Sequence, residues 1–243
     1  TNGMSTPIFT LRADQSKLIA DYRLEGGNVI LVAPTGFGKT VVMGKLALES
    51  TVPSVAIAHR HELVGQISTA IARFGVPHNI IASQSSVNFC IQKHVRDFGR
   101  SFYSPRAPFT VASVDTLAAR ADSLAQWANQ IGFWMIDECH HVLGNNKWGK
   151  AIAMFPRARG VGFTATPVRA DRKSLARAQG GVFDSMVVGP PMRDLINRGS
   201  LCDYRIFAPP QSIDRSAIAI GASGDFSGAS MRKEAHESKI VGD

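Results

Sequence analysis

Eight residues, 33–40 (Ala-Pro-Thr-Gly-Phe-Gly-Lys-Thr), have the composition of a loop that binds a polyphosphate. The segment follows an apolar run and precedes a run of helical character, which is the strand–turn–helix context that such a loop requires. Glycines reach φ values closed to other residues, so backbone N–H groups can turn inward around phosphates, and the helix directs its positive end at them. We expect the nucleotide to be bound by Thr35, Gly36, Gly38, Lys39 and Thr40.

Two of these side chains have distinct expected tasks. Lys39 would reach the β- and γ-phosphates, and the Thr40 hydroxyl would ligate Mg²⁺. One position departs from the general pattern G-x-x-x-x-G-K-[ST], because Ala33 stands where that pattern has its first glycine. A chance glycine turn before a helix is the alternative, and a second motif further along the chain weighs against it.

The second motif, residues 133–140, leads from four apolar residues into Asp137 and Glu138, which suits a buried strand with acids at its carboxyl end. Asp137 could hold Mg²⁺, through water because Mg²⁺ dehydrates reluctantly, and Glu138 could orient or deprotonate an attacking water. Alone, such a pair would more simply be a solvated acidic turn. Downstream of a phosphate loop, the sequence predicts the catalytic residues Lys39, Asp137 and Glu138 and the metal ligands Thr40 and Asp137.

Together these motifs resemble those of superfamily 2 helicases and translocases. Residues 137–140 (Asp-Glu-Cys-His) resemble a variant DEAD/DEAH box, and Ala-x-Thr-Gly-x-Gly-Lys-Thr is that superfamily's usual phosphate loop, so Ala33 is expected there. Further segments that resemble the family's motifs, in the family's order, are 11–15, 58–66, 110–117 and 162–167. The likeness is to members of the phage, DNA-repair or restriction type.

The resemblance implies roles for residues outside the two motifs. Gln15 would recognise adenine, since an amide can both donate to and accept from a base edge; an ordinary polar residue on the first helix is the alternative. His140 resembles the histidine that links the box to the last segment, although it could merely bond a backbone group. Thr164 and Thr166 would sense the bound nucleotide, and His141 is expected to be a bystander.

Three residues are implied to contact a nucleic-acid backbone: Arg60, Ser113 and Thr116. Arginine and hydroxyl groups are usual phosphate binders, and such contacts carry no sequence information. Arg60 could instead form an ion pair with Glu62 or another acid. By analogy with DNA-repair, phage and restriction members, DNA is favoured over RNA as the partner.

Apolar runs of β type alternate with helical patterns, which predicts a parallel sheet covered on both faces. Combined with the resemblance, this predicts an α/β, RecA-like P-loop NTPase domain with a mostly parallel sheet and helices on both faces. Strands are expected at 29–33, 54–58, 79–82, 109–113, 133–136, 160–164 and, as a candidate, 204–208, and helices at 39–49, 62–74, near 116 and at 148–154. The resemblance places strand 160–164 between 29–33 and 133–136. Residues 83–108 have a mixed secondary-structure pattern, and residues 101–108 are expected to form an exposed loop.

Composition agrees with this interpretation. The chain has 243 residues, 44% of them hydrophobic, and a formal net charge of +8, which fits a polyanionic partner. A cationic stretch could face phosphates; it contains Arg157, Arg159, Arg169, Arg172, Lys173 and Arg177. No apolar run approaches the roughly 18 residues of a membrane span, and no secretory signal is visible, so we expect a cytoplasmic protein without a membrane partner.

The three cysteines form no C-x-x-C pair or disulfide framework. Cys90 and His94 could share a metal on a helix, but an unrelated pair is the simpler interpretation. Cys139 is expected to pack rather than to act as a nucleophile.

Three regions are expected along the chain. Residues 1–3 resemble an expression remnant, residues 4–208 a first RecA-like ATP-binding helicase domain, and residues 209–243 a linker or the start of a truncated second RecA-like domain.

The predicted function is the motor domain of an ATP-dependent helicase or translocase that uses ATP and Mg²⁺. Because arginine fingers come from the second domain in this superfamily, the fragment alone should hydrolyse ATP weakly. The alternative is a nucleotide-gated nucleic-acid-binding subunit of a restriction or repair complex; the box and Thr-Ala-Thr-Pro argue against a P-loop kinase.

Overall fold

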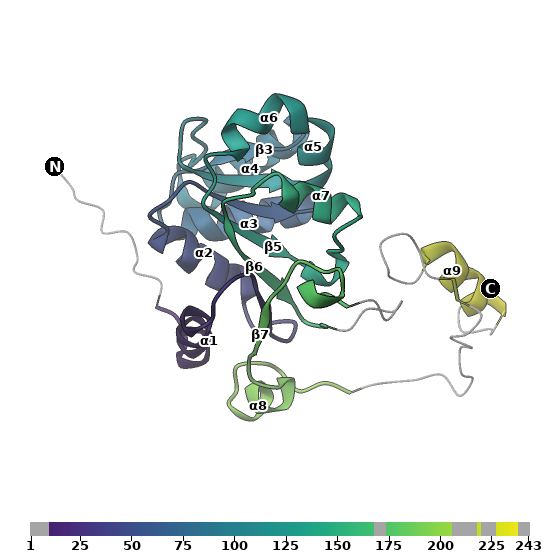
Figure 1. Ribbon diagram of the computed structural model, residues 1–243. Coiled ribbons are helices and arrows are strands. Elements are labelled where there is room, and N and C mark those ends of the chain that lie inside the picture. The colour runs from purple at the N-terminus through teal and green to yellow at the C-terminus, as the bar shows by residue number, and fades with distance from the viewer. Residues whose placement is uncertain (1–9, 168–173, 206–217, 220–226, 238–243) are drawn as a thin grey trace.

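The computed structural model describes residues 10–167, 174–205, 218–219 and 227–237 (Figure 1). Its centre is a seven-stranded sheet with the order β3-β4-β2-β5-β6-β1-β7, in which every pairing is parallel. The strands are β1 Val29–Val32, β2 Ser54–Ala58, β3 Asn79–Ile81, β4 Phe109–Ser113, β5 Phe133–Asp137, β6 Arg159–Thr164 and β7 Ser185–Val188. The predicted parallel α/β architecture is confirmed, and β6 lies between β1 and β5, as the resemblance implies.

Helices cover both faces of the sheet (Figure 1). The helices of the described residues are α1 Ala13–Leu24, α2 Lys39–Glu49, α3 His61–Arg73, α4 Gln84–Phe98, α5 Val114–Ala119, α6 Ala121–Ala128, α7 Lys147–Ala153, α8 Met192–Asn197 and α9 Gly228–Glu237, with 3₁₀ turns η1 Cys139–His141 and η2 Arg177–Gln179. The helices α1 to α7 supply side chains that pack on the two faces. Successive strand residues point to opposite faces. Leu31 therefore joins the core formed with α1 to α4, whereas Ile30 joins the core formed with α5 to α7.

The register brings the carboxyl ends of the central strands level with one another. Val32 is paired with Thr164 on one side and with Val188 on the other, and Ala58 is paired with Ser113. The loops that follow these strands therefore begin at similar positions along the strand direction, at one edge of the sheet. In open α/β sheets, this edge is where ligands bind.

Two parts of the structure differ from expectation. A long helix, α4, occupies the segment interpreted as mixed; the Ser83 hydroxyl accepts the Ser86 N–H at its start, and Gly99 ends it with φ +71°. The following loop is not simply exposed, because Phe102 is 8% exposed and packs edge-on against Phe98. The candidate strand at 204–208 lies mostly outside the described residues, as does the segment 1–3.

Candidate functional site

The glycine-rich segment forms a tight loop between β1 and α2. Gly36 and Gly38 have φ of +83° and +86°, values that favour glycine. The loop is tied to the sheet where the Ala33 N–H donates to Thr164 O (3.0 Å), and α2 begins with the Val41 N–H donating to Gly38 O (2.9 Å). The ammonium of Lys39 lies over the loop, 3.4 Å from Ala33 O.

The start of α1 supports this loop from the side. The Gln15 amide donates to Phe37 O (2.9 Å) while its oxygen accepts the Arg12 N–H (3.1 Å). The Arg12 guanidinium donates to the same Phe37 O at 2.6 Å. Gln15 is 3% exposed, and its hydrogen bond to Phe37 O turns it toward the loop. Its bonds with Phe37 O and the Arg12 N–H use one N–H and one lone pair of the amide, which has a further N–H and a further lone pair. The sequence offered no signal for the support by Arg12, because it depends on a tertiary contact.

The two acids lie at the end of β5, and Asp137 is 6% exposed. Burial and then the charge of Glu138 raise the pKa of Asp137 to about 6, while the Glu138 N–H and the Lys39 ammonium oppose that rise. The Glu138 N–H donates to Asp137 Oδ1 at 3.0 Å. Lys39 and Asp137, far apart in sequence, are therefore close enough to influence each other electrostatically.

Glu138 has φ +52°, the one positive φ among the non-glycine residues that the structure describes. This left-handed residue turns the chain sharply out of β5 into η1. Cys139, which follows, is fully buried against Gly162 of β6, and burial raises the pKa of its thiol well above the usual value. A buried neutral thiol is a packing group, not a nucleophile.

The three predicted coupling residues are joined by hydrogen bonds. Thr164 Oγ1 donates to Thr166 O (3.0 Å) and accepts the Thr166 N–H (3.1 Å). Because the single hydroxyl proton is used there, His140 Nδ1, 3.0 Å from the same oxygen, acts as the donor. That nitrogen is also 3.4 Å from Glu138 Oε2. His140 thus connects the acid box to the end of β6.

The residues predicted to contact nucleic acid lie at the carboxyl ends of the neighbouring strands β2 and β4. Arg60 is exposed and donates from Nε to His59 Nε2 (3.1 Å), not to Glu62. Ser113 precedes α5 without capping it, and Thr116 is half-buried one turn later. The three share one edge, but no hydrogen bond between them is present among the described residues.

The expectation that the cationic stretch faces phosphates is wrong for two of its members. The Arg159 guanidinium, at the opposite edge of the sheet, donates to Tyr22 O, Glu25 O and Gly27 O at 3.3, 2.6 and 3.0 Å. Arg177 forms an ion pair with Asp184 (2.6 Å). Both therefore support the fold. Three further members lie outside the described residues: Arg169, Arg172 and Lys173.

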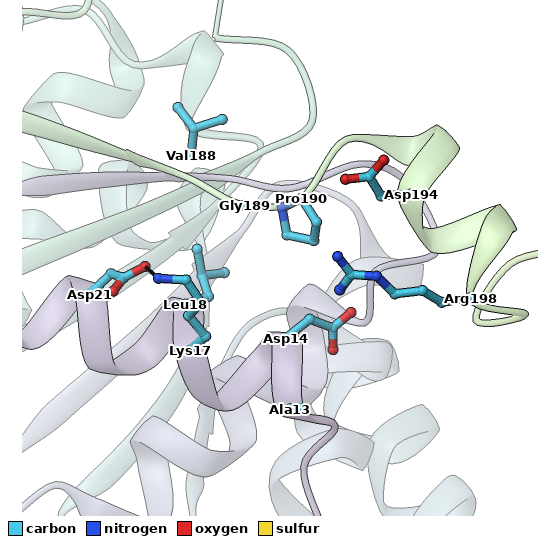
Figure 2. Close-up of a pocket in the computed structure, with 10 residues that line it drawn as sticks. All are labelled: Ala13, Asp14, Lys17, Leu18, Asp21, Val188, Gly189, Pro190, Asp194 and Arg198. Atoms are coloured by element: carbon cyan, nitrogen blue, oxygen red, sulfur yellow. Dashed lines mark hydrogen bonds and ion pairs between the residues drawn. The ribbon is translucent and has the colours of Figure 1, made fainter.

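A cavity of about 400 Å³ lies between α1, the end of β7 and α8 (Figure 2), and its wall includes Gly189, whose N–H donates to Val32 O (2.7 Å) at the end of β1. Its apolar wall includes Leu18, Val188 and Pro190. Figure 2 shows the side chains of Asp14 and Arg198 pointing toward one another from α1 and α8. Sequence analysis missed β7 and α8 as parts of this edge.

The donor set at the edge suits Mg²⁺, since the Asp137 carboxylate and the Thr40 hydroxyl are oxygen ligands. The buried Asp137 carboxylate, with its raised pKa, is a group that a nearby cation would stabilise. In the part of the chain that the structure describes, no three His, Cys, Asp or Glu side chains are arranged to hold a metal by themselves. His94 of α4 instead hydrogen-bonds Ser68 (2.9 Å).

Within the described ranges, no helix combines the length and apolarity needed to cross a membrane.

Residues 8–169 match the protein family described as type III restriction enzyme, res subunit. Similar solved structures include the UvsW helicase from bacteriophage T4, with a TM-score of 0.54 and 18% identity over 74% of this chain and 60% of that one. A hypothetical ATP-dependent RNA helicase from Sulfolobus tokodaii also has a TM-score of 0.54, with 21% identity over 74% of this chain and 53% of that one.

The type ISP restriction-modification enzyme LlaGI, solved as a nuclease-deletion mutant with a DNA substrate mimic, has a TM-score of 0.54 and 14% identity over 79% of this chain and 21% of that one. No curated protein sequence matches the chain. The chain spans less than two thirds of the length of each of these three proteins. At these identities the likeness establishes a shared, RecA-like fold.

Proposed function

The chain belongs to the type III restriction enzyme res-subunit family and contains a superfamily 2 helicase-like first RecA-like domain, and from this we propose that it is the ATP-binding motor domain of a nucleic-acid helicase or translocase. The observation that carries the proposal is that Lys39, in the loop that follows β1, and Asp137, at the end of β5, lie at the same edge of the sheet on either side of β6, near enough for the Lys39 ammonium to oppose the rise in the pKa of Asp137. A phosphate-loop lysine and a buried carboxylate at one edge can hold a metal-bound triphosphate between them.

Each residue has a task that follows from its position. Lys39 and the loop N–H groups bind the β- and γ-phosphates, and Thr40 and Asp137 would hold Mg²⁺, which neutralises phosphate charge. Glu138 orients the attacking water and accepts its proton. His140 fixes the Glu138 carboxylate relative to Thr164, so the phosphate end of the site is connected to β6.

We place the nucleoside part of ATP in the cavity between α1 and α8. The hydrogen bond from Gly189, in the cavity wall, to Val32 O joins the cavity to the end of β1, from which the phosphate loop leaves, and the apolar side chains of Leu18 and Pro190 suit a base. Asp14 and Asp194 offer carboxylates to ribose hydroxyls. Gln15, which lies on the same helix and faces the phosphate loop but is not among the residues that line the cavity, is proposed to contact adenine at the loop side with its remaining N–H and lone pair.

We propose DNA as the favoured polyanion, bound through Arg60, Ser113 and Thr116. The net charge of +8 supports a polyanionic partner, and the DNA complex of LlaGI is a precedent for this fold. The proposed domain spans residues 4–208, with residues 209–243 leading to a second RecA-like domain. Since that domain would supply the arginine fingers, these 243 residues should bind ATP–Mg²⁺ but hydrolyse it weakly.

The test measures nucleotide binding by this chain, and ATP hydrolysis by a protein extended through its second domain, with single-stranded DNA, duplex DNA or RNA added. Lys39→Ala should weaken ATP binding at least about tenfold, because it removes a charged contact to the phosphates. Lys45→Ala is the matched control, since that lysine lies on the same helix but pairs with Glu49 (3.0 Å). Equal ATP affinity in the Lys39→Ala variant and the wild type would contradict the proposal.

One alternative is favoured by the restriction-enzyme description of the family: a nucleotide-gated subunit that binds nucleic acid without unwinding it. A strand-displacement assay on the extended protein separates the two. Displacement of a labelled strand with ATP supports the helicase, whereas ATP-dependent binding without displacement or translocation supports the gated subunit.

A further inference from the structure

Two histidines that the proposed nucleotide site does not use, His59 and His141, pack against each other at the carboxyl edge of the sheet. Their ring centroids are 5.7 Å apart at an interplanar angle of 69°. Both rings also contact Trp148, with centroid distances of 5.2 and 5.3 Å. Trp148 is 2% exposed. A buried indole thus supports both imidazoles.

A clamp around Asn146 holds one side of this cluster in place. The Asn146 side-chain amide donates to His141 O (2.6 Å), and its oxygen accepts the Trp148 N–H (3.0 Å). The backbone of His141 and the start of α7 are therefore tied together. If the His59 ring moves, it presses on the His141 and Trp148 rings, whose backbone positions Asn146 fixes. Chains of packed side chains of this kind can transmit energetic coupling between two binding sites.

One end of the cluster reaches the proposed nucleic-acid contact. The Arg60 guanidinium donates to His59 Nε2, so the proton of the neutral ring is on Nδ1. That Nδ1 is buried and has no hydrogen-bond partner among the described residues. Burial, His141 and Arg60 lower the pKa of His59, which keeps the ring neutral. If Arg60 turns to a phosphate, His59 loses the hydrogen bond that orients it.

The other end of the cluster reaches the acid box. The rings of His140 and His141 are 4.1 Å apart. His140 in turn contacts Thr164 Oγ1 and the Glu138 carboxylate. A continuous set of contacts therefore runs from Arg60 through His59, His141 and His140 to Glu138 and Thr164.

We infer that His59 and His141 are positioning residues that couple backbone contact at Arg60 to the arrangement of Glu138 and Thr164. The inference rests on the proposed function, because it requires both ATP and nucleic acid to bind. Coupling between two ligands is reciprocal, so nucleic acid should change the affinity for ATP by the same factor by which ATP changes the affinity for nucleic acid.

The experiment measures the Kd of a fluorescent non-hydrolysable ATP analogue with Mg²⁺, with and without saturating oligothymidylate. The wild-type ratio of the two Kd values should be at least about fivefold. His59→Phe keeps a ring but removes the acceptor for Arg60, and His141→Ala removes the neighbouring ring. Each should reduce the ratio below about twofold, and the double variant should reduce it no further, because both act in one set of contacts.

His61→Phe is the matched control, because His61 is on the other side of Arg60 in sequence and points to α4, where it contacts Ser86 (2.7 Å) and Phe89. Its ratio should stay at the wild-type value, and thermal melting should verify that each variant is folded. A wild-type ratio of one, or unchanged ratios in folded His59→Phe and His141→Ala, would overturn the inference while leaving the proposed function intact. A wild type that binds neither ligand would overturn both.

Discussion

At the scale of single residues, Asp137 shows how the site sets function against stability. The fold buries a carboxylate whose pKa is raised to about 6. The unfolded chain releases this proton near pH 3.8, whereas the folded chain holds it until about pH 6. The stability that the protonated form contributes is therefore lost as the pH rises from 3.8 to 6, and at neutral pH the fold carries the whole cost of the buried charge.

Replacing this carboxylate by its neutral isostere should stabilise the metal-free protein. A shift of about 2 pKa units corresponds to about 3 kcal/mol, so Asp137→Asn should raise the free energy of unfolding at pH 7.5 by about 1 to 3 kcal/mol. The same change should abolish Mg²⁺-dependent ATP binding. Urea denaturation and nucleotide titration measure the two effects.

Asp21→Asn is the control for this substitution, since Asp21 is a surface acid paired with Lys17 (2.8 Å). Its effect on the free energy of unfolding should stay within about 0.5 kcal/mol. If Asp137→Asn destabilised the protein at pH 7.5, the interpretation of Asp137 as a costly buried charge would be wrong.

At the scale of elements, the contact between β6 and η1 determines how closely the acid box approaches the sheet. Gly162 of β6 lies beneath Cys139, and a Cβ added there would be 2.6 Å from the Cys139 Cβ and 2.7 Å from Phe183 Cε1. Real carbon atoms do not approach so closely. A glycine at this point in β6 therefore lets η1, which contains His140 and directly follows Glu138, lie flat on the strand.

Gly162→Ala should push η1 away from the sheet. Overpacking of a buried contact costs about 1 to 3 kcal/mol, and the loss should appear as a lower urea midpoint. ATP binding should weaken at the same time, because Asp137 and Glu138 move with η1. In Gly26→Ala the new methyl meets nothing within 4 Å, so its midpoint should match the wild type. A Gly162→Ala variant of full stability would show that η1 adapts freely.

The elements also show where sequence analysis succeeded and where it did not. The glycine-rich loop before α2 and the two acids at the end of β5 belong to local patterns, so their places in the fold could be predicted, while their chemical roles stay predictions. Helix α4 was missed because polar residues interrupt its apolar positions, although Ser83 and Gly99 mark its two ends. Strand β7 was missed because it has four residues and its place depends on pairing with β1, far away in sequence.

Within the site, the sequence could not predict contacts between residues that are far apart along the chain. The identities of Lys39 and Asp137 could be read from their motifs, but the support of Phe37 O by Arg12 could not. His141 was expected to be a bystander, yet it packs on His59 and Trp148. No local sequence pattern predicts such a contact, because it forms only when the end of β2 and η1 come together at the edge of the sheet.

At the scale of the whole molecule, a buried polar network joins segments away from the carboxyl edge of the sheet. Ser68 Oγ lies 2.7 Å from His78 Nε2 and 2.9 Å from His94 Nε2, and all three residues are buried. The Phe102 N–H donates to His94 Nδ1 (3.3 Å), and His78 Nδ1 lies 2.9 Å from Val76 O. Helices α3 and α4 and the approach to β3 are held together through neutral imidazoles.

This network should make global stability sensitive to acid. Burial lowers the pKa of His78 from 6.5 to about 4 and lowers the pKa of His94, which also faces Asp97 and Lys93. The unfolded chain gains protons below pH 6.5, so the stabilisation is present above pH 6.5 and is lost as the pH falls toward 4. Between pH 7.5 and pH 5 the free energy of unfolding should fall by about 2 kcal/mol through His78 alone.

His78→Gln cannot titrate and retains one donor and one acceptor, so unfolding of this variant should depend less steeply on pH over the same range. The comparison is made by urea denaturation at pH 7.5, 6 and 5. His61→Gln serves as the control and should follow the wild-type curve. Parallel curves for the wild type and His78→Gln would exclude His78 as the origin of the acid sensitivity.

The order of the strands has a consequence for how the protein is made. Strand β1 leaves the ribosome before both of its neighbours, β6 and β7, which are synthesised more than a hundred residues later. Until then, an apolar strand attached to the phosphate loop has no partner on either side, and such unpaired edges invite aggregation. A nascent chain that stalls before residue 188 cannot complete this sheet, so chaperones should bind the emerging polypeptide most strongly during that interval.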